Sequence, residues 1–295
     1  MASSIYYTGF ADEAGQELET QIKATRELGW NAIEMRNVKV CGFESGNLHD
    51  ISDDAFEALA EQLATAGVRV NSLGSAIANG AKSILKPFDG CLEATKRAAK
   101  RAPKLHAEFI RIMSYPIGDI ADLHEKERFR RLREIVAIFA DTGVTVVHEN
   151  CGNYGGMGWT YTLRLLENVP GLKLVFDTGN PLNDTDYTKP EPHPKQSAWE
   201  FYRQVKDQVV YVHVKDGTWD AQTGKLKQCF PGEGQGDVER ILRDLLADGY
   251  SGGLSIEPHM GAALNDPSLS QQENCYATYV EYGRRLMALT ARINP

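Results

Sequence analysis

Eight short apolar segments, each followed by a segment with helical spacing, recur along the 295 residues of this chain. The apolar segments are rich in β-branched and aromatic residues, which favour buried strands. Strands that alternate with helices predict a parallel sheet, because a parallel pair of strands needs a long crossover connection. The expected strands cover residues 5–10, 32–36, 68–73, 109–113, 144–150, 172–177, 209–214 and 253–257.

The segments between these strands predict one helix per strand. They cover residues 16–28, 55–66, 88–101, 123–142, 161–168, 197–207, 237–247 and 267–289. Eight strand–helix units over this length favour an α/β fold of the closed (β/α)8 TIM barrel type over an open doubly wound sheet. No Gly-x-Gly-x-x-Gly follows the first strand, which weakens a dinucleotide-binding interpretation. No linker or shift in composition divides the chain, so we predict one domain over residues 1–295.

Composition narrows the class of protein. Apolar residues make up 42% and charged residues 24% of the chain, as in globular proteins with a sizeable core. The net charge is −8 and no run of Lys and Arg is present, which argues against a nucleic-acid partner. The five cysteines show no close pairing, which indicates a reducing compartment. We see no signal peptide and no apolar stretch long enough to span a membrane, so we expect a cytoplasmic protein without a membrane partner.

Polar residues end the last four expected strands. In chain order they are Glu149, Asp177, His213 and Glu257. The carboxyl ends of barrel strands form one face of the molecule, so these side chains are expected to be neighbours. Any one of them alone would be an ordinary solvated loop residue, but four in succession indicate a metal site. Three carboxylates and an imidazole without sulfur suit Mn²⁺, Mg²⁺ or Co²⁺ better than a closed structural zinc site.

Four motifs at these strand ends carry a resemblance to a known family: Val147-His-Glu-Asn150, Phe176-Asp-Thr-Gly-Asn180, Val212-His-Val-Lys-Asp216 and Ser255-Ile-Glu-Pro258. With them and the later Pro231-Gly-Glu-Gly234, the chain resembles the sugar phosphate isomerase/epimerase family with the xylose-isomerase-like TIM barrel. The resemblance implies one divalent metal ion, Mn²⁺ ahead of Mg²⁺ or Co²⁺ and Zn²⁺ last, held by Glu149, Asp177, His213 and Glu257. It also implies that Glu149 and Glu257 act as acid and base.

Two positions depart from the ketose epimerases of that family. Those enzymes often carry a histidine three residues after the metal aspartate, where Asn180 stands here. They also carry an arginine after the seventh-strand histidine, where Lys215 and Asp216 stand. These departures argue against a free-ketose 3-epimerase in particular.

The leading functional hypothesis is a metal-dependent isomerase or epimerase of a small-molecule sugar or sugar-derived ketone, acting through proton abstraction and an enediolate. The alternative is a lyase or dehydratase, which expels a β-leaving group after the same first step. Apurinic endonucleases share the barrel, but they need histidines at early strand ends, where Asn71-Ser72 and Met113-Ser114 stand. A non-catalytic sugar-binding barrel would bind metal without turnover. A homo-oligomer is compatible with the sequence, which leaves the oligomeric state open.

Further candidates for substrate contact surround the four expected ligands. Lys215 lies two residues beyond His213, so strand alternation points it to the same side, although a surface lysine is the ordinary alternative. Asn180 is a candidate because it ends the motif Phe176-Asp-Thr-Gly-Asn180, three residues after the expected ligand Asp177. Four residues lie at or near the ends of earlier strands, where substrate contact and an internal ion pair are equal alternatives: Glu34, Arg36, Asn71 and Arg111.

Three aromatic or imidazole side chains complete the predictions. His259 follows the expected ligand Glu257 and is a candidate contact at the rim of the site. Trp219 lies in an expected polar loop after the seventh strand, where an indole either stacks on a sugar face or shields the loop. His148 neighbours Glu149 and is expected to face the opposite side, beneath a helix.

Overall fold

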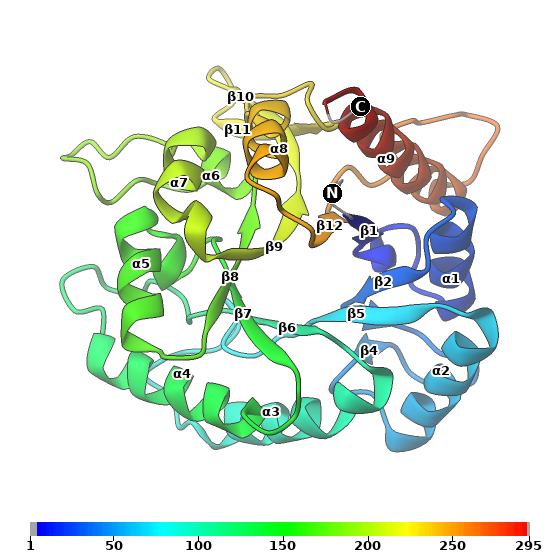
Figure 1. Cartoon of the computed structure of the whole chain (residues 1–295), viewed down its shortest axis with the longest axis horizontal. Coiled ribbons are helices and arrows are strands. Elements are labelled where there is room, and N and C mark those ends of the chain that lie inside the picture. Colours follow the sequence, from blue (N-terminus) through cyan, green and yellow to red (C-terminus); the bar gives the residue numbers. More distant parts are fainter. Residues whose placement is uncertain (1–4, 294–295) are drawn as a thin grey trace.

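Eight parallel strands form a closed barrel in a computed structural model that describes residues 5–293 (Figure 1). The sheet runs in the order β1-β12-β9-β8-β7-β6-β5-β2, and a parallel bridge between Phe10 and Glu34 joins its two ends. The prediction of a (β/α)8 TIM barrel is confirmed. The strands are β1 (Tyr6–Gly9), β2 (Ala32–Met35), β5 (Arg69–Gly74), β6 (Phe109–Ile112), β7 (Thr145–Glu149), β8 (Lys173–Asp177), β9 (Val209–Val214) and β12 (Gly253–Ile256).

Helices surround the barrel and cover the outer face of the sheet (Figure 1). Their buried residues lie on one side; in α8, for example, Ile241, Leu242 and Leu245 are buried while Arg243 is exposed. The helices are α1 (Leu18–Glu27), α2 (Asp53–Ala66), α3 (Asp89–Arg101), α4 (Glu125–Phe139), α5 (Trp159–Asn168), α6 (Asn180–Asn183), α7 (Ala198–Val205), α8 (Val238–Ala247) and α9 (Gln271–Ile293).

The last helix begins later than its sequence indicated. We expected a helix over residues 267–289, whereas α9 spans Gln271–Ile293. Ser270 and Glu273 form reciprocal contacts across the first turn, because the Glu273 backbone N–H donates to Ser270 Oγ at 3.3 Å and the Ser270 N–H donates to Glu273 Oε2 at 2.8 Å. This capping box, rather than Pro267, defines the start of the helix.

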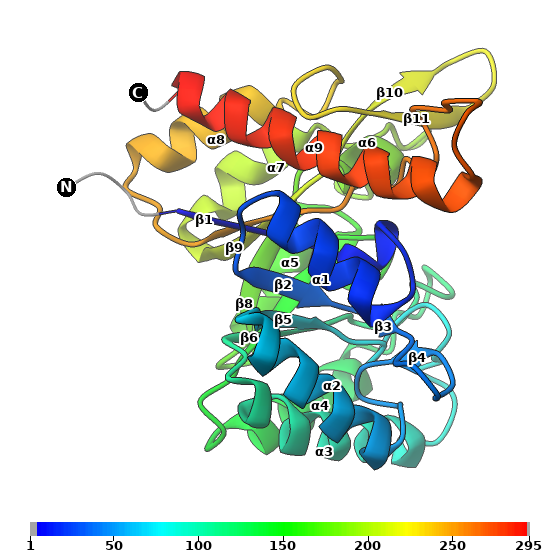
Figure 2. The same cartoon turned by 90° about the vertical axis from the view of Figure 1, so that its right-hand side faces the viewer.

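Two antiparallel hairpins extend from the barrel at the end opposite the two termini (Figure 2). The larger pairs β10 (Asp216–Asp220) with β11 (Lys225–Cys229), and the smaller pairs β3 (Asn37–Val38) with β4 (Gly46–Asn47). The segment after the seventh barrel strand was expected to be a polar loop, so the larger hairpin is a difference from that expectation. Both hairpins directly follow residues at the carboxyl ends of barrel strands, and they therefore flank that end of the barrel.

The side chains inside the barrel follow from strand alternation. Val147, Val175 and Tyr211 form a small apolar cluster that is separate from the main core between sheet and helices. Each lies two residues before an expected metal ligand on the same strand, so the ligand side chains also point into the barrel. On β7, β8 and β9 the side chains that precede the expected ligands are thus apolar, and the ligands lie toward the carboxyl ends of these strands.

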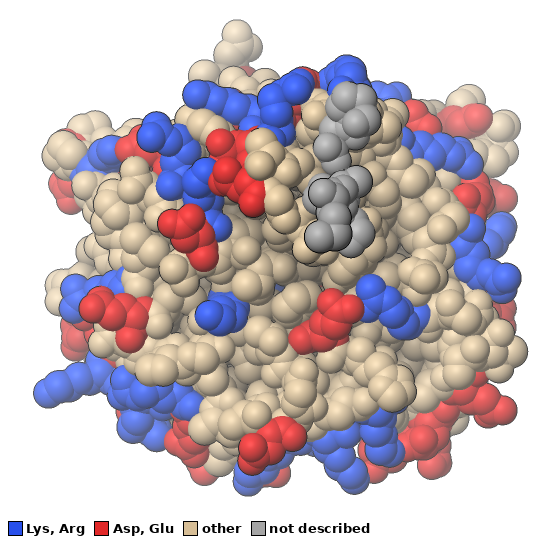
Figure 3. Space-filling view, in the orientation of Figure 1, with Lys and Arg blue, Asp and Glu red and all other residues tan. Residues whose placement is uncertain are grey.

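The face that carries the two termini has basic and acidic side chains interspersed around a mostly uncharged centre (Figure 3). Among the residues that the structure describes, no helix combines the length and apolar character needed to cross a membrane.

Candidate metal centre

The four residues at the ends of the last four barrel strands meet in one cluster. Glu149 and Asp177 end β7 and β8, His213 lies near the end of β9, and Glu257 directly follows β12. One ligand atom from each residue lies within 4.8 Å of the corresponding atoms of the other three. None of the four residues is more than 3% exposed. The structure therefore brings together all four expected ligands at one buried point.

The polar atoms of this cluster face a common space. His213 Nδ1 lies 3.8 Å from Glu149 Oε2 and 3.8 Å from Glu257 Oε2. Among the described residues, three buried atoms have no aligned hydrogen-bond partner: His213 Nδ1, His213 Nε2 and Asp177 Oδ2. Charged groups lie close to two of them, with Lys215 Nζ 3.3 Å from Asp177 Oδ2 and Glu34 Oε2 3.1 Å from His213 Nε2. A buried polar atom without a partner is costly, and a metal ion at this cluster would satisfy His213 Nδ1 and Asp177 Oδ2. The residues present thus fit a divalent cation.

The charged side chains around the four expected ligands also favour a bound cation. Five buried carboxylates gather here, and only three permanently cationic side chains contact them. Carboxylates thus outnumber the permanent cations that contact them, and a bound divalent cation would offset the excess negative charge. The carboxylates belong to Asp12, Glu34, Glu149, Asp177 and Glu257, and the cations to Arg36, Arg111 and Lys215.

The pKa values of Asp177 and His213, two of the expected ligands, are both raised in this negatively charged pocket. Burial, reinforced by Glu257 and Glu149, outweighs the ammonium of Lys215 and raises the pKa of Asp177 to about 6. Burial alone would lower the pKa of His213, but the carboxylates of Glu34 and Glu149 raise it to about 10. Both shifts show a pocket that stabilises added positive charge.

Backbone and amide groups hold Asp177 in place. Asp177 Oδ1 accepts hydrogen bonds from the backbone N–H groups of Gly179 at 2.9 Å and Asn180 at 2.6 Å, which leaves Oδ2 for the cluster. Asn150 continues the pairing of β7 with β8, since its side chain donates to Asp177 O at 3.0 Å and accepts from Asp177 N at 2.7 Å. Sequence reasoning did not assign this role to Asn150, although the residue stands in the first quoted motif.

Each glutamate of the cluster has an arginine of its own. Arg111 Nη1 donates to Glu149 Oε2 at 2.8 Å, and Arg36 Nη1 donates to Glu257 Oε1 at 3.2 Å. Both guanidinium groups lie over the ring of Phe10, at 5.2 Å and 4.6 Å from its centroid. The aromatic ring thus supports both arginines from one position. For Arg36 the structure shows an internal ion pair, one of the two alternatives expected for it. Phe10 was not among the expected site residues, because nothing in its local sequence indicates these contacts.

Lys215 lies inside the site. Its Nζ lies 3.0 Å from Glu257 Oε2 and 3.3 Å from Asp177 Oδ2, and the residue is 5% exposed. Thr178 brackets its backbone, with Oγ1 donating to Lys215 O at 2.6 Å and accepting from Lys215 N at 3.0 Å. The surface alternative for this lysine is therefore excluded, and strand alternation predicted its direction correctly.

Asn180 and His259 both contact the predicted catalytic glutamates. Asn180 Nδ2 donates to Glu149 Oε1 at 2.8 Å. His259 Nε2 lies 2.8 Å from Glu257 Oε1, and its side chain is 44% exposed, as expected for a position at the rim. Burial would raise the pKa of Glu257, but Lys215 and His259 hold it well below its usual range, so this carboxylate stays ionised. Substrate contact by either residue remains a proposal.

Asn71 and Glu34, two further candidates for substrate contact, are packed inside the barrel. Asn71 is fully buried and has both amide atoms engaged, accepting from Thr8 Oγ1 at 2.7 Å and donating to Tyr211 OH at 2.9 Å. Glu34 is also fully buried and lies behind His213, with 3.1 Å between Oε2 and Nε2. For both residues the geometry favours a supporting position over contact with a substrate.

Trp219 and His148 belong to the periphery of the site. Trp219 lies on β10, half-buried, with the ammonium of Lys195 4.5 Å from the indole centroid. His148 faces away from the cluster, as expected, and its Nε2 lies 3.0 Å from Ser114 Oγ and 2.9 Å from Asn153 Oδ1. A stacking role for Trp219 remains a proposal.

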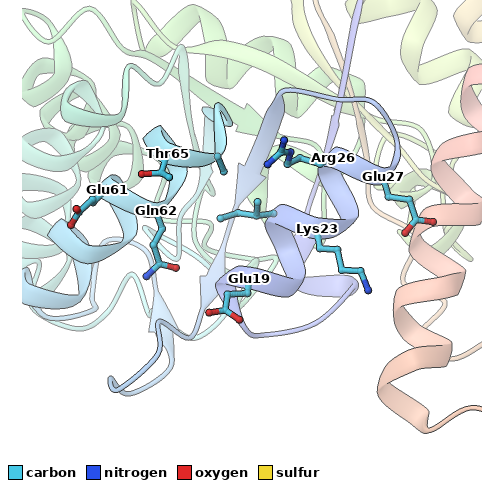
Figure 4. A pocket seen from close by; sticks show the side chains of 9 residues that line it. Glu19, Lys23, Arg26, Glu27, Glu61, Gln62 and Thr65 are labelled. Atoms are coloured by element: carbon cyan, nitrogen blue, oxygen red, sulfur yellow. The ribbon is translucent and has the colours of Figure 1, made fainter.

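A surface hollow of about 810 Å³ lies between α1 and α2, on the outside of the barrel. Charged and polar side chains line it, among them Glu19, Lys23, Arg26 and Glu61 (Figure 4). It shares no residue with the buried cluster, which therefore remains the candidate site on chemical grounds.

Comparison with known proteins agrees with this architecture. A family model described as xylose isomerase-like TIM barrel matches residues 22–276. The chain belongs to this family. No curated protein matches the chain in sequence.

Solved structures of the xylose isomerase-like type match the chain over nearly its whole length. A xylose isomerase-like TIM barrel protein from Mycobacterium smegmatis, solved with magnesium, is 17% identical, with a TM-score of 0.67 and coverage of 97% of both chains. D-psicose 3-epimerase from Clostridium cellulolyticum H10 is 15% identical, with a TM-score of 0.64 and coverage of 96% and 99%. A probable 3-DHS dehydratase from Bacillus anthracis is 16% identical, with a TM-score of 0.66 and coverage of 96% and 98%. At these identities the similarity shows the fold alone.

Proposed function

We propose that this protein is a divalent-metal-dependent isomerase or epimerase of a sugar or sugar-derived ketone. One observation carries the proposal: Glu149 and Glu257 come from β7 and β12, and each places Oε2 at 3.8 Å from His213 Nδ1. Two other strands, β8 and β9, separate these glutamates in the sheet, so the carboxylates approach the common space from different sides. Transfer of a proton between two faces of one carbon needs such a pair.

The chain's own residues divide the chemistry between them. One glutamate removes the proton next to the carbonyl, and the other supplies a proton, either to the opposite face in an epimerase or to a neighbouring atom in an isomerase. Arg111 pairs with Glu149 and Arg36 with Glu257, and these charge-assisted contacts hold one oxygen of each carboxylate in place. Lys215 Nζ, next to Asp177 and Glu257, is placed to donate to an oxygen that becomes negative.

Glu149, Asp177, His213 and Glu257 would hold the metal. When bound, a divalent cation polarises the carbonyl and offsets the negative charge that follows proton removal, which is worth several kcal/mol. The oxygen-rich donor set favours Mn²⁺, and the structure of the Mycobacterium smegmatis relative with magnesium supports Mg²⁺ as the next choice.

A lyase or dehydratase is the second candidate, and the similarity to a probable 3-DHS dehydratase favours it. Such an enzyme uses the same proton abstraction but then expels a leaving group from the neighbouring carbon. A single base suffices for that first step, although the second glutamate can act as the acid that protonates the leaving group. The product therefore separates the two candidates, an epimer or isomer in one case and an unsaturated compound in the other.

The test compares E149Q and E257Q with the wild type on D-psicose, D-tagatose and a 3-keto-D-glucoside, in deuterated water with Mn²⁺. We expect the wild type to incorporate deuterium at the carbon that changes configuration. Each variant should lose at least about 10²-fold in turnover, since each removes one acid–base group. Because Asn180 and Lys215 depart from the ketose-epimerase pattern, we expect the keto-glucoside to react faster than the free ketoses.

A glutamate outside the site provides the matched control. E167Q changes Glu167 on the outer helix α5, and this variant should react like the wild type. If E149Q and E257Q both retain activity, the two-carboxylate mechanism is wrong, and an unsaturated product in place of an epimer would support the lyase.

A further inference from the structure

Glu34 is a fully buried carboxylate on β2 that is surrounded by donors from inside the barrel. Its Oε2 accepts hydrogen bonds from Tyr211 OH at 2.7 Å and Ser255 Oγ at 2.6 Å. Its Oε1 accepts from Ser72 Oγ at 2.8 Å. A buried carboxylate is stable in its ionised form only when donors saturate it, and these three hydroxyl groups do so.

The donors form a directed network. Tyr211 OH accepts a hydrogen bond from Asn71 Nδ2 at 2.9 Å, so its own proton is committed to Glu34. Asn71 Oδ1 in turn accepts from Thr8 Oγ1 at 2.7 Å. All these side chains are fully buried at the centre of the barrel, where apolar residues would otherwise pack. A polar network in such a place is costly unless it is complete, which indicates that the charge of Glu34 has a purpose.

His213 is the imidazole that faces this carboxylate. Glu34 Oε2 lies 3.1 Å from His213 Nε2, a close charge contact without an aligned hydrogen bond. His213 Nδ1 faces Glu149 and Glu257 from the other side of the ring. The rings of Phe10 and Tyr211 meet the imidazole edge-on, at centroid distances of 5.0 Å and 5.5 Å. These contacts fix the plane of the ring, so the position of its proton decides which nitrogen can bind a metal.

We propose that Glu34 is a positioning residue that holds the proton of His213 on Nε2 and thereby presents the Nδ1 lone pair to the metal. The inference rests on the proposed metal site and assigns Glu34 a place behind a ligand instead of contact with substrate. A neutral imidazole donates through one ring nitrogen and accepts through the other, so an anion beside Nε2 selects the tautomer. Partners of this kind typically change metal affinity by about 10–100-fold.

An ordinary internal ion pair is the competing explanation. It predicts that loss of the Glu34 charge changes the stability of the barrel and leaves metal affinity unaffected. The two explanations therefore differ in a quantity that can be measured without any substrate.

The test is Mn²⁺ binding by calorimetry, with no substrate present, to wild type, E34Q and E167Q. Glutamine is nearly isosteric with glutamate, so E34Q removes mainly the charge that selects the tautomer. We expect E34Q to bind Mn²⁺ about 10–100-fold more weakly. E167Q is the matched control, since Glu167 is exposed on the outer helix α5, and it should bind as the wild type does. Equal affinity of wild type and E34Q would overturn the inference.

A second measurement uses the wild type alone and so does not depend on the folding of a variant. In ¹⁵N-histidine-labelled protein with Mg²⁺, long-range NMR spectra should show His213 with its proton on Nε2 and none on Nδ1. A proton on Nδ1 would overturn the inference while leaving metal binding itself intact. Failure of the wild type to bind either ion would instead remove the proposed function, and the inference with it.

Discussion

At the scale of single residues, the most informative side chain of the site is Lys215. An ammonium group that is 5% exposed would be unstable in an apolar pocket, but here two carboxylates lie within 3.3 Å of it. Burial lowers the pKa of this lysine, and the charges of Asp177 and Glu257 more than reverse that effect. Lys215 therefore stays protonated and can act as a fixed donor.

K215M tests this donor role. The substitution keeps the approximate length of the side chain and removes its charge, so turnover should fall by about 10²-fold. Metal content, measured by elemental analysis, should stay at the wild-type level, because the four expected ligands are untouched. K225M is the control, since Lys225 is an exposed lysine on β11. Unchanged kinetics of K215M would mean that Lys215 only balances charge.

At the scale of elements, the turn between β8 and α6 packs directly against the end of β9. A Cβ atom placed on Gly179 would lie 2.7 Å from Lys215 Cγ and 2.9 Å from Lys215 Cβ. Glycine is thus required here by close packing, and this turn also supplies the backbone N–H groups that hold Asp177. The position of Lys215 and the orientation of Asp177 depend on the same few residues.

G179A should therefore destabilise the fold by about 1–3 kcal/mol through overpacking. It should also lower activity, because the turn must move away from Lys215. G90A in α3 is the matched control: a Cβ at Gly90 would meet no atom within 4 Å, so alanine should stabilise the protein by about 0.4–1 kcal/mol. Urea denaturation compares the two variants. A G179A protein as stable as the wild type would show that the turn is free to relax.

At the scale of the whole molecule, the site is a place where the barrel gathers negative charge from several strands. The carboxylates of Glu34, Glu149, Asp177 and Glu257 come from four different strands or their ends. Their mutual repulsion opposes closure of the barrel, and a divalent cation that binds only the folded state relieves it.

We therefore expect added metal to raise the melting temperature. At a concentration about 100 times its Kd, Mn²⁺ should stabilise the folded protein by about 2.7 kcal/mol, and a chelator should reverse the effect. Thermal unfolding of H213A is the control, since loss of one ligand should abolish most of the response. An equal response in H213A would place the stabilising ion elsewhere on the molecule.

Local patterns in the sequence determined the architecture of the barrel and the identity of the clustered residues. Strand and helix segments can be recognised in the sequence because their apolar residues recur at spacings typical of each kind of element. Glu149, Asp177, His213 and Glu257 were predictable as neighbours because the carboxyl ends of parallel strands lie at one end of a barrel. The direction of Lys215 followed from its spacing of two residues from His213.

Only the tertiary structure decided which partner each of these side chains has. The pairs Arg111–Glu149 and Arg36–Glu257 join residues 38 and 221 positions apart in the sequence, and no local pattern encodes them. The place of Glu34 behind His213 depends on how the barrel closes and on a register shift between Ile33 and Glu34. Strand alternation tells which side a residue faces, whereas the twist and closure of the sheet determine what it meets there.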